Sequence, residues 1–264
     1  MDEKQFIYFV CLKSNKDLLK KEIEVFHKYL TPSFSKGEFL TYKNTRKSLS
    51  VKEIQGMNMA FALKWGENKG KIDNEKISSL LDECSIKIDL PQESPSRAYL
   101  KIAEACELFS IKPSKSLNWI EFGSAPGGAS YYLLNQFDKL LGVDPAKMDQ
   151  ICLDNERFEH LSKPIQDLSQ EMLPDHNIHY ITSDLNLNPK QAIKEVIRLG
   201  KKYRSLKGIL MTIKIVKPEH VGLIPEFEKM FEDAKYTEIR RVQLPSHRRE
   251  FLIFAEKNAH VFRS

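Results

Sequence analysis

Four charged side chains of this sequence could do proton-transfer chemistry together: Lys101, Asp184, Lys214 and Glu250. Lys214 is the hardest to explain as an ordinary surface residue, because isoleucines flank it inside the apolar run 209–216. A lysine in a buried strand is costly unless it is paired or functional. Desolvation or a neighbouring cation can turn a lysine into a general base, and nearby carboxylates can orient its amine.

Each of these residues also has an ordinary interpretation. Lys101 and Glu250 could be solvated surface residues. Asp184 could cap the turn after its strand, and Lys214 could reach water from an edge strand. The four residues together are therefore better evidence for a catalytic group than any one of them alone.

A second set of residues could hold a cofactor. Residues 119–131 read WIEFGSAPGGASY, in which an apolar strand carrying Glu121 runs into a turn with three glycines and then a helix. Glycines let a ligand approach the backbone, and Pro126 stiffens the turn. Asp144 ends the next strand, where doubly wound folds offer a carboxylate to ribose hydroxyls. The turn is neither GxGxxG nor a P-loop, so nicotinamide and nucleotide sites are disfavoured; a βα turn without a ligand is the alternative.

The elements that position these residues alternate between strand and helix. The strands are expected at 118–122, up to 144, 179–184, 208–216 and 251–255, and the helices at about 97–110, 129–136, 189–201 and 224–234. Such alternation predicts an α/β fold with a doubly wound, Rossmann-like, mainly parallel sheet. The carboxyl ends of its strands line one crevice, where ligands bind.

The first ninety residues predict a separate small α+β domain. Strands are expected at 6–12, 38–42, 59–65 and 86–90, and helices at 15–30 and 74–84. This order suits a ferredoxin-like fold, a candidate RNA-binding unit. The prolines in 91–95 indicate a linker. We therefore expect a domain at 1–90 and a Rossmann-like domain at 91–264.

Composition sets wide bounds on function. The 264 residues carry a formal net charge of +5, which permits a polyanionic partner without requiring one. The four cysteines are widely spaced and show no zinc-ligand pattern, so we expect reduced thiols and no metal. No apolar run approaches the length that spans a bilayer, and the N-terminus lacks a signal-peptide core. We therefore expect a cytoplasmic protein with no membrane partner.

The segment from Glu121 to Gly128, EFGSAPGG, resembles the first motif of FtsJ-like methyltransferases, Asp/Glu-x-Gly-x-x-Pro-Gly-Gly. The resemblance implies S-adenosylmethionine as cofactor, with the turn contacting its methionine part and Asp144 its ribose. Asp167 matches the position that meets the adenine amino group. One departure is Ala129, where the family has a bulky aromatic, which implies altered packing beside the cofactor. The implied cofactor-binding residues are Glu121, Gly123, Ser124, Ala125, Pro126, Gly127, Gly128, Asp144, Asp167 and Asp184.

In family order, the four charged residues resemble the Lys-Asp-Lys-Glu tetrad of FtsJ-like ribose 2′-O-methyltransferases. The resemblance implies that Lys214 is the base, that Asp184 and Glu250 orient it, and that Lys101 tunes the local charge. A ribose hydroxyl is a very weak acid, so its deprotonation needs such a tuned group.

Within that family, the chain looks most similar to the methyltransferase M family that acts on large-subunit ribosomal RNA. The motifs that carry this likeness are PSR-x3-K before the cofactor strand, the Pro-Gly-Gly turn, the strand that ends in Ser-Asp184, and HRRE at 247–250. The likeness covers 94–256 well and the first ninety residues only loosely. The sequence has no room for that family's THUMP domain, so the resemblance leaves the choice of RNA substrate open.

RNA is the partner that the resemblance implies, and basic residues occur in several runs. We expect Arg97, Arg248 and Arg249 to contact RNA because they adjoin tetrad residues. Two alternatives remain: a non-catalytic RNA-binding protein with a relic fold, and a base methyltransferase. The intact tetrad disfavours the first. The segment after Asp184, Leu-Asn-Leu, lacks the Pro-Pro-aromatic signature of amino-group methylation, which disfavours the second.

Overall fold

The computed structural model describes residues 4–70 and 73–257 and divides into two compact units. Unit 1 comprises Met1–Lys87 together with two later segments, Lys214–Ile224 and Arg241–Leu252. Unit 2 comprises Ile88–Ile213, Pro225–Arg240 and Ile253–Ser264. The first unit therefore includes residues that are distant in sequence from the first ninety.

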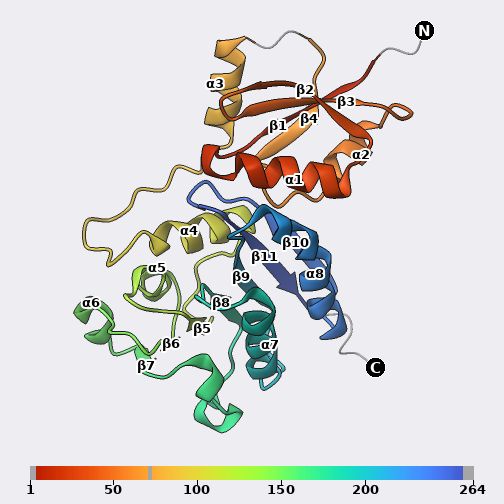
Figure 1. Ribbon diagram of the computed structural model, residues 1–264. Coiled ribbons are helices and arrows are strands. Elements are labelled where there is room, and N and C mark those ends of the chain that lie inside the picture. Colours follow the sequence, from red (N-terminus) through yellow and green to blue (C-terminus); the bar gives the residue numbers. More distant parts are fainter. Residues whose placement is uncertain (1–3, 71–72, 258–264) are drawn as a thin grey trace. The chain divides into compact units, whose positions relative to one another are not determined.

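Unit 1 is built on a four-stranded antiparallel sheet with the strand order β2-β3-β1-β4. This order and the succession strand–helix–strand–strand–helix–strand are those of a ferredoxin-like fold. Figure 1 shows α1 and α3 on opposite sides of the sheet. The elements are β1 (Phe6–Val10), η1 (Lys13–Asn15), α1 (Lys16–Phe26), β2 (Leu30–Lys36), β3 (Phe39–Asn44), α2 (Val51–Gln55), β4 (Lys64–Glu67) and α3 (Asn74–Glu83).

The topology expected for this unit is the one observed, but different elements make it up. Residues 86–90 form no strand, so that prediction was wrong. The missing strand is β2, an edge strand that its proline and serines conceal and that carries a bulge between Pro32 and Phe34. The second helix is α2, which begins with a capping box between Ser50 and Glu53.

Unit 2 contains most of a seven-stranded sheet with the order β10-β11-β9-β8-β5-β6-β7. The pairs β5–β6, β6–β7, β5–β8 and β8–β9 are parallel. The order reverses between β5 and β8, which is the switch point where doubly wound sheets bind ligands. The strands are β5 (Trp119–Phe122), β6 (Leu140–Val143), β7 (Phe158–Leu161), β8 (Tyr180–Ser183), β9 (Gly208–Lys214), β10 (Glu238–Val242) and β11 (Glu250–Glu256).

Helices cover both faces of this sheet. Figure 1 shows α4, α5 and α6 on one side and α7 and α8 on the other. Four of these helices begin and end within a few residues of the predicted positions. The short helix α6 was not predicted. The helices are α4 (Ala98–Leu108), α5 (Gly128–Gln136), α6 (Gln150–Leu153), α7 (Pro189–Gly200) and α8 (Ile224–Asp233), with the 3-10 turns η2 (Ile165–Asp167), η3 (Gln170–Met172) and η4 (Pro218–Leu223).

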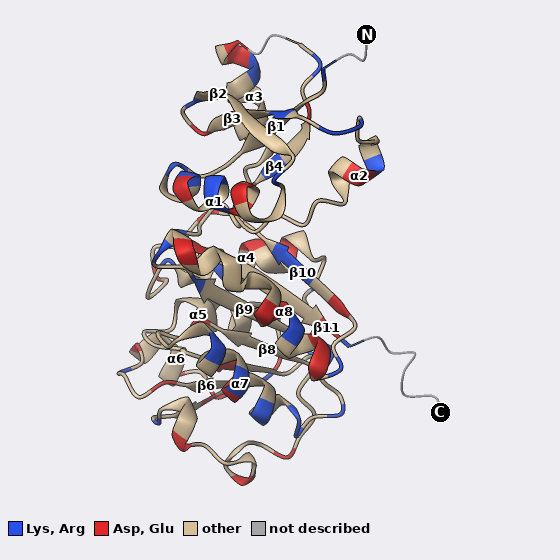
Figure 2. Ribbon diagram, turned by 45° about the vertical axis from the view of Figure 1, so that its right-hand side comes forward, with Lys and Arg blue, Asp and Glu red and all other residues tan. Residues whose placement is uncertain are grey.

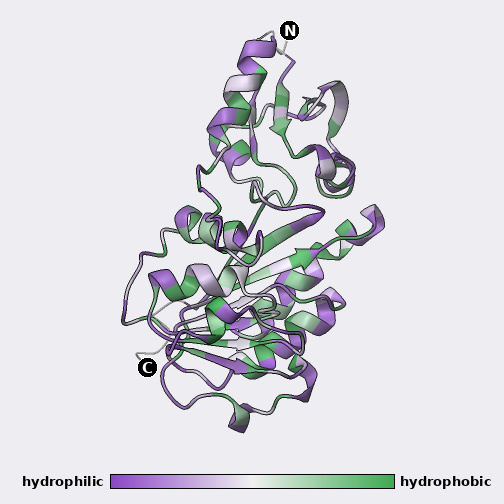
Figure 3. Cartoon of the chain, turned by 90° about the vertical axis from the view of Figure 1, so that its left-hand side faces the viewer, coloured by the Kyte–Doolittle hydropathy of each residue, from purple (hydrophilic) through white to green (hydrophobic). Residues whose placement is uncertain are grey.

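The central strands are hydrophobic on both faces because helices cover both. All residues of β5 and β6 are buried, as are those of β9 up to Ile213. Figure 3 shows the resulting hydrophobic strands among more hydrophilic loops. The expected α/β class is confirmed. Sequence reasoning missed the short outer strands β7 and β10, which are only partly buried and lack long apolar runs.

Candidate active site

The glycine-rich turn follows β5 and leads directly into α5, as the sequence predicted. Gly123 and Gly127 have positive φ angles of 84° and 120°, which side chains rarely allow. A Cβ atom on Gly123 would lie 2.6 Å from the carbonyl oxygen of Asp184. The end of β5 therefore contacts the residue that follows β8, and the two central strands meet at the switch point without room for a side chain.

The segment that precedes α4 also lies against this turn. A Cβ on Gly128 would come within 2.3 Å of the Ser96 hydroxyl oxygen and 2.5 Å of its carbonyl oxygen. Arg97 is the N-cap of α4 and is exposed. The close approach at Gly128 thus brings the beginning of α4, with its exposed arginine, beside the turn.

Glu121 lies in β5, one residue before the strand ends, and is buried. Its Oε2 accepts a 2.6 Å hydrogen bond from the Ser130 hydroxyl. Burial raises the pKa of Glu121 to about 8; the Ser130 hydrogen bond opposes the rise, and the charges of Asp184 and Asp144 add to it. A cation placed near this carboxyl group would stabilise its charged form.

Asp144 follows β6 and holds the backbone of the turn. Its Oδ2 accepts a hydrogen bond from the Ala125 N–H (3.2 Å), and its Oδ1 accepts one from the Ala146 N–H (2.8 Å). Asp167 is the last residue of η2 and is exposed. Asp144 therefore contacts the glycine turn directly, through the Ala125 N–H.

Lys101 and Asp184 form an ion pair in unit 2. The Lys101 Nζ lies 2.8 Å from Asp184 Oδ2, and the two side chains are 22% and 28% exposed. Because Gly123 contacts the backbone of Asp184, this pair stands immediately beside the glycine turn. Two of the four charged residues predicted to act together are thus in direct contact.

Lys214 and Glu250 belong to unit 1. Lys214 is the last residue of β9 and is partly exposed, so it ends a strand that was expected to run on to residue 216. Glu250 is the first residue of β11, the neighbouring strand, and is 5% exposed. The Ile215 N–H donates a 2.8 Å hydrogen bond to the Arg249 carbonyl, which joins the end of β9 to the beginning of β11.

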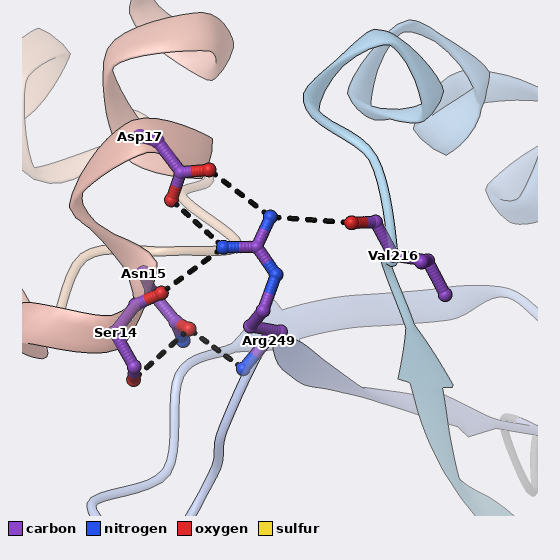
Figure 4. A network of polar contacts seen from close by, with 5 residues as sticks. All are labelled: Ser14, Asn15, Asp17, Val216 and Arg249. Carbon is purple, nitrogen blue, oxygen red and sulfur yellow. Dashed lines mark hydrogen bonds and ion pairs between the residues drawn. The ribbon is translucent and has the colours of Figure 1, made fainter.

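Arg249 is engaged within unit 1, as Figure 4 shows. Its guanidinium binds both carboxylate oxygens of Asp17 in α1, at 3.0 and 3.1 Å, and the Val216 carbonyl at 3.3 Å. Partial burial opposes the effect, but the hydrogen bond and charge of Arg249 hold the pKa of Asp17 below its usual value. Arg248, by contrast, is exposed. Of these two predicted RNA contacts, Arg249 is thus paired with Asp17 in a partly exposed ion pair.

Sequence reasoning missed Asn15, which is fully buried beneath Arg249. Its Oδ1 accepts a 2.7 Å hydrogen bond from the Arg249 N–H, and its Nδ2 donates a 2.6 Å hydrogen bond to Gln243. Arg249 itself has a φ of 54°, a rare value for a residue with a side chain. The partners lie more than 200 positions apart, so no local pattern could have indicated them.

The described residues, 4–70 and 73–257, contain no group of three or more His, Cys, Asp or Glu side chains that could hold a metal ion. No helix in those same ranges is long and apolar enough to cross a membrane.

Comparison with known proteins places the chain in a family. Residues 95–241, more than half of the chain, match the model of the FtsJ-like methyltransferases. The ribosomal RNA large subunit methyltransferase M of Azotobacter vinelandii is 31% identical over 81 residues, which cover 28% of this chain and 23% of that protein. The protein of the same name from Laribacter hongkongensis is 30% identical over 112 residues, which cover 39% of this chain and 30% of that protein.

These matches span less than a third of either relative. Among solved structures, a proposed hemolysin from Lactococcus lactis aligns with a TM-score of 0.51 at 14% identity, covering 64% of this chain and 90% of that one. That likeness shows a shared fold. The motif of the turn, the switch-point geometry and the family match agree, and the chain belongs to the FtsJ-like methyltransferase family.

Proposed function

We propose that this chain is an S-adenosylmethionine-dependent RNA methyltransferase that methylates a ribose 2′-hydroxyl of large-subunit ribosomal RNA. Membership in the FtsJ-like family supports methyl transfer. The names of the relatives from Azotobacter vinelandii and Laribacter hongkongensis support ribosomal RNA as the substrate. The observation that carries the proposal is the Lys101–Asp184 ion pair beside the glycine turn, because it puts a lysine and a carboxylate at the ligand-binding edge of the sheet.

The residues of the turn fit the proposed cofactor. Gly123 and Gly127 leave a backbone surface without side chains, and Glu121 offers a buried carboxyl group that a cationic ligand would ionise. We propose that residues 121–128 and Asp184 hold the methionine part, that Asp144 binds the ribose and that Asp167 reaches the adenine. When bound, S-adenosylmethionine supplies a methyl group activated by a positively charged sulfur.

We further propose that Lys214 and Glu250 act with Lys101 and Asp184. Within unit 2, residues 180–183 of β8 pair in parallel with residues 208–211 of β9, the strand that ends at Lys214. The Ile215–Arg249 hydrogen bond brings the start of β11 to the end of β9. What supports the joint role is membership in the FtsJ-like family, whose tetrad these four residues resemble in order.

In this proposal, each member of the tetrad has a distinct task. Lys214 is the base: its amine accepts the proton of the ribose hydroxyl as that oxygen is methylated. Asp184 and Glu250 hold the amine in position, and the positive charge of Lys101 offsets the negative charge that Asp184 brings. Arg97 and Arg248, both exposed, and Arg249, whose side chain is partly exposed, are the proposed contacts to RNA phosphates.

The proposal is tested with methyl-labelled S-adenosylmethionine and unmodified large-subunit ribosomal RNA. Lys214→Ala should lower the rate of label transfer by about 10²- to 10⁴-fold, because the proton of the hydroxyl loses its acceptor. Lys217→Ala is the matched control, since Lys217 is an exposed lysine three positions away. Full activity of Lys214→Ala would contradict the assignment of the base.

One other outcome of this assay would favour a different function. Cofactor binding by the wild-type protein without any transfer to RNA would favour a protein that binds RNA but does not methylate it.

The proposed RNA contacts are tested separately. Double replacement of Arg248 and Arg97 by Glu should weaken RNA binding and leave cofactor affinity unchanged, because neither side chain belongs to the glycine turn. Unchanged RNA affinity of this variant would remove both arginines from the proposed interface.

A further inference from the structure

One face of the unit 1 sheet carries aromatic and basic side chains in cross-strand rows. Directly opposed residues of antiparallel strands point to the same face. Phe6 of β1 is opposed by Lys43 of β3, and Tyr8 is opposed by Thr41. Phe34 of the edge strand β2 is in turn opposed by Thr41. The rows therefore place two phenylalanines, a tyrosine and a lysine on one face.

Helix α3 covers only one end of this face. Leu80 of α3 forms a buried cluster with Val10 and Phe39, and Tyr8 packs at its border, stacked on Phe39 with ring centroids 5.8 Å apart. At the same end, Lys64 of β4 pairs with Glu83 of α3, and Lys36 of β2 donates a hydrogen bond to Asn74. These contacts fix α3 over the Val10 row.

The other end of the face forms an open groove. Its volume is about 950 Å³, and its lining includes Lys4, Phe6, Phe34, Thr41 and Lys69. The Phe34 side chain is 49% exposed, although a phenylalanine is among the residues most often buried. An aromatic ring held by a strand and presented to solvent at the mouth of a groove is ready to stack on a flat ligand.

The charges around the groove favour an anionic ligand. Lys4 and Lys69 line it, and Lys43 lies on the same face opposite Phe6. The one acidic lining residue, Glu67, lies 3.6 Å from Lys69 and accepts a hydrogen bond from Gln5. Lys69 thus offsets the charge of Glu67, and Lys4 and Lys43 remain as the cations that favour an anionic ligand.

We propose that this groove binds single-stranded RNA, with bases stacked on Phe6 and Phe34 and phosphates near Lys4 and Lys43. Aromatic rings interleaved with cations are the recurring means of holding single strands, because each base offers a face for stacking and each nucleotide a phosphate. A duplex hides the faces of its bases and would meet only the lysines. The inference extends the proposed RNA substrate by naming a second place where the strand is held.

The test measures binding of a fluorescent single-stranded RNA oligonucleotide to the full chain by anisotropy. Phe34→Ala should weaken binding by about 5- to 100-fold through the loss of one stacked base. Val51→Ala is the control, because Val51 is an exposed apolar residue on α2, at 59% exposure. Phe34→Leu serves as a second variant that keeps an apolar side chain but removes the ring, and it should lose affinity similarly. Equal affinity of wild type and both Phe34 variants would overturn the proposal.

Two accompanying measurements locate the strand. Lys43→Met should make the slope of log affinity against log salt less steep by about 0.7, the share of one phosphate contact with a single strand. A 5-iodouridine oligonucleotide, cross-linked by light and mapped by mass spectrometry, should attach to peptides containing Phe6 or Phe34. Cross-links confined to other peptides, or equal competition by duplex RNA, would overturn the proposal.

This inference and the proposed function fail separately. Binding needs no methyl transfer, so an inactive chain whose RNA affinity falls in Phe34→Ala still supports the groove. A chain that methylates RNA but binds it equally well with or without the Phe34 ring would lose only the groove.

Discussion

At the scale of single residues, the candidate site contains acids and bases that the fold keeps partly or wholly from water. Glu121 is the clearest case, since it is 4% exposed and its nearest recorded polar partner is the Ser130 hydroxyl. The fold tolerates this carboxyl group because burial raises its pKa to about 8, so that it carries its proton through much of the neutral range.

The raised pKa of Glu121 predicts a loss of stability with rising pH. The unfolded chain releases this proton near the ordinary value of 4.5, whereas the folded chain keeps it up to about 8. Between those values the folded state holds more protons, so stability falls as the pH rises through this window. Glu121→Gln should reduce that fall in urea unfolding from about pH 5 to about pH 8.5. An exposed control, Glu93→Gln, should keep the wild-type dependence, and an unchanged dependence in Glu121→Gln would contradict the prediction.

Removal of the Lys101 charge should impair catalysis more than cofactor binding. In Lys101→Ala, the Asp184 carboxylate loses the ammonium group 2.8 Å away, and the proposed tetrad loses the cation that offsets this carboxylate. We expect about 10²-fold slower methyl transfer, with S-adenosylmethionine affinity within severalfold of wild type by calorimetry. Lys112→Ala, at an exposed lysine, is the control. Equal transfer rates in the two variants would argue against a role for Lys101.

At the scale of elements, the site depends on close approaches between a turn and its neighbours. The β5–α5 turn accommodates Asp184 only because Gly123 has no side chain, and α4 approaches only because Gly128 has none. The same strand ends carry the acids of the candidate site, so the residues that pack against the turn are close in sequence to those proposed to act.

Gly123→Ala should therefore distort the backbone of the glycine turn. Its φ of 84° strains any residue with a Cβ, and that atom would meet the Asp184 carbonyl at 2.6 Å. We expect a loss of about 1–3 kcal/mol in unfolding free energy and a large loss of cofactor affinity. The control is Gly222→Ala in η4, where an added Cβ meets nothing within 4 Å. Wild-type cofactor affinity in Gly123→Ala would contradict this account of the turn.

Asn15, which lies in η1 just before α1, holds the segment that precedes Glu250 through hydrogen bonds with Arg249 and Gln243. Replacing Asn15 by Leu leaves the Arg249 N–H and the Gln243 amide without their buried partner. Unfolding free energy should fall by about 1–3 kcal/mol, the usual cost of unsatisfied buried polar groups. Asn135→Leu, at an exposed position of α5, should change stability by less than about 0.5 kcal/mol. Similar stability of the two variants would show that the network in Figure 4 contributes little.

Periodicity and motifs predicted the elements that carry long apolar runs or a signature turn. They were enough for β5, β8, β9, β11 and the glycine turn, and for the Lys101–Asp184 contact as an expectation. They failed for β2 and β10, because edge strands with polar faces show no clear alternation. They also failed for Asn15 and Asp17, because contacts between distant segments leave no local pattern.

At the scale of the whole molecule, the chain joins a family methyltransferase fold to a ferredoxin-like sheet. Lysines and arginines are interspersed with acids over both units rather than gathered in one block, as Figure 2 shows. The net charge of +5 alone therefore predicts no single RNA surface. The proposed function assigns methyl transfer to the larger sheet. The groove on the smaller sheet is proposed to bind the same RNA at a second place.

The central claim is that the methyl group goes to a ribose 2′-hydroxyl, and the stability of the product to alkali tests it most directly. Large-subunit ribosomal RNA labelled by the wild-type protein is hydrolysed in alkali and separated by size. A methylated 2′-oxygen cannot attack its phosphate, so the account predicts label in alkali-resistant dinucleotides. Label in mononucleotides would show methylation of a base and contradict it.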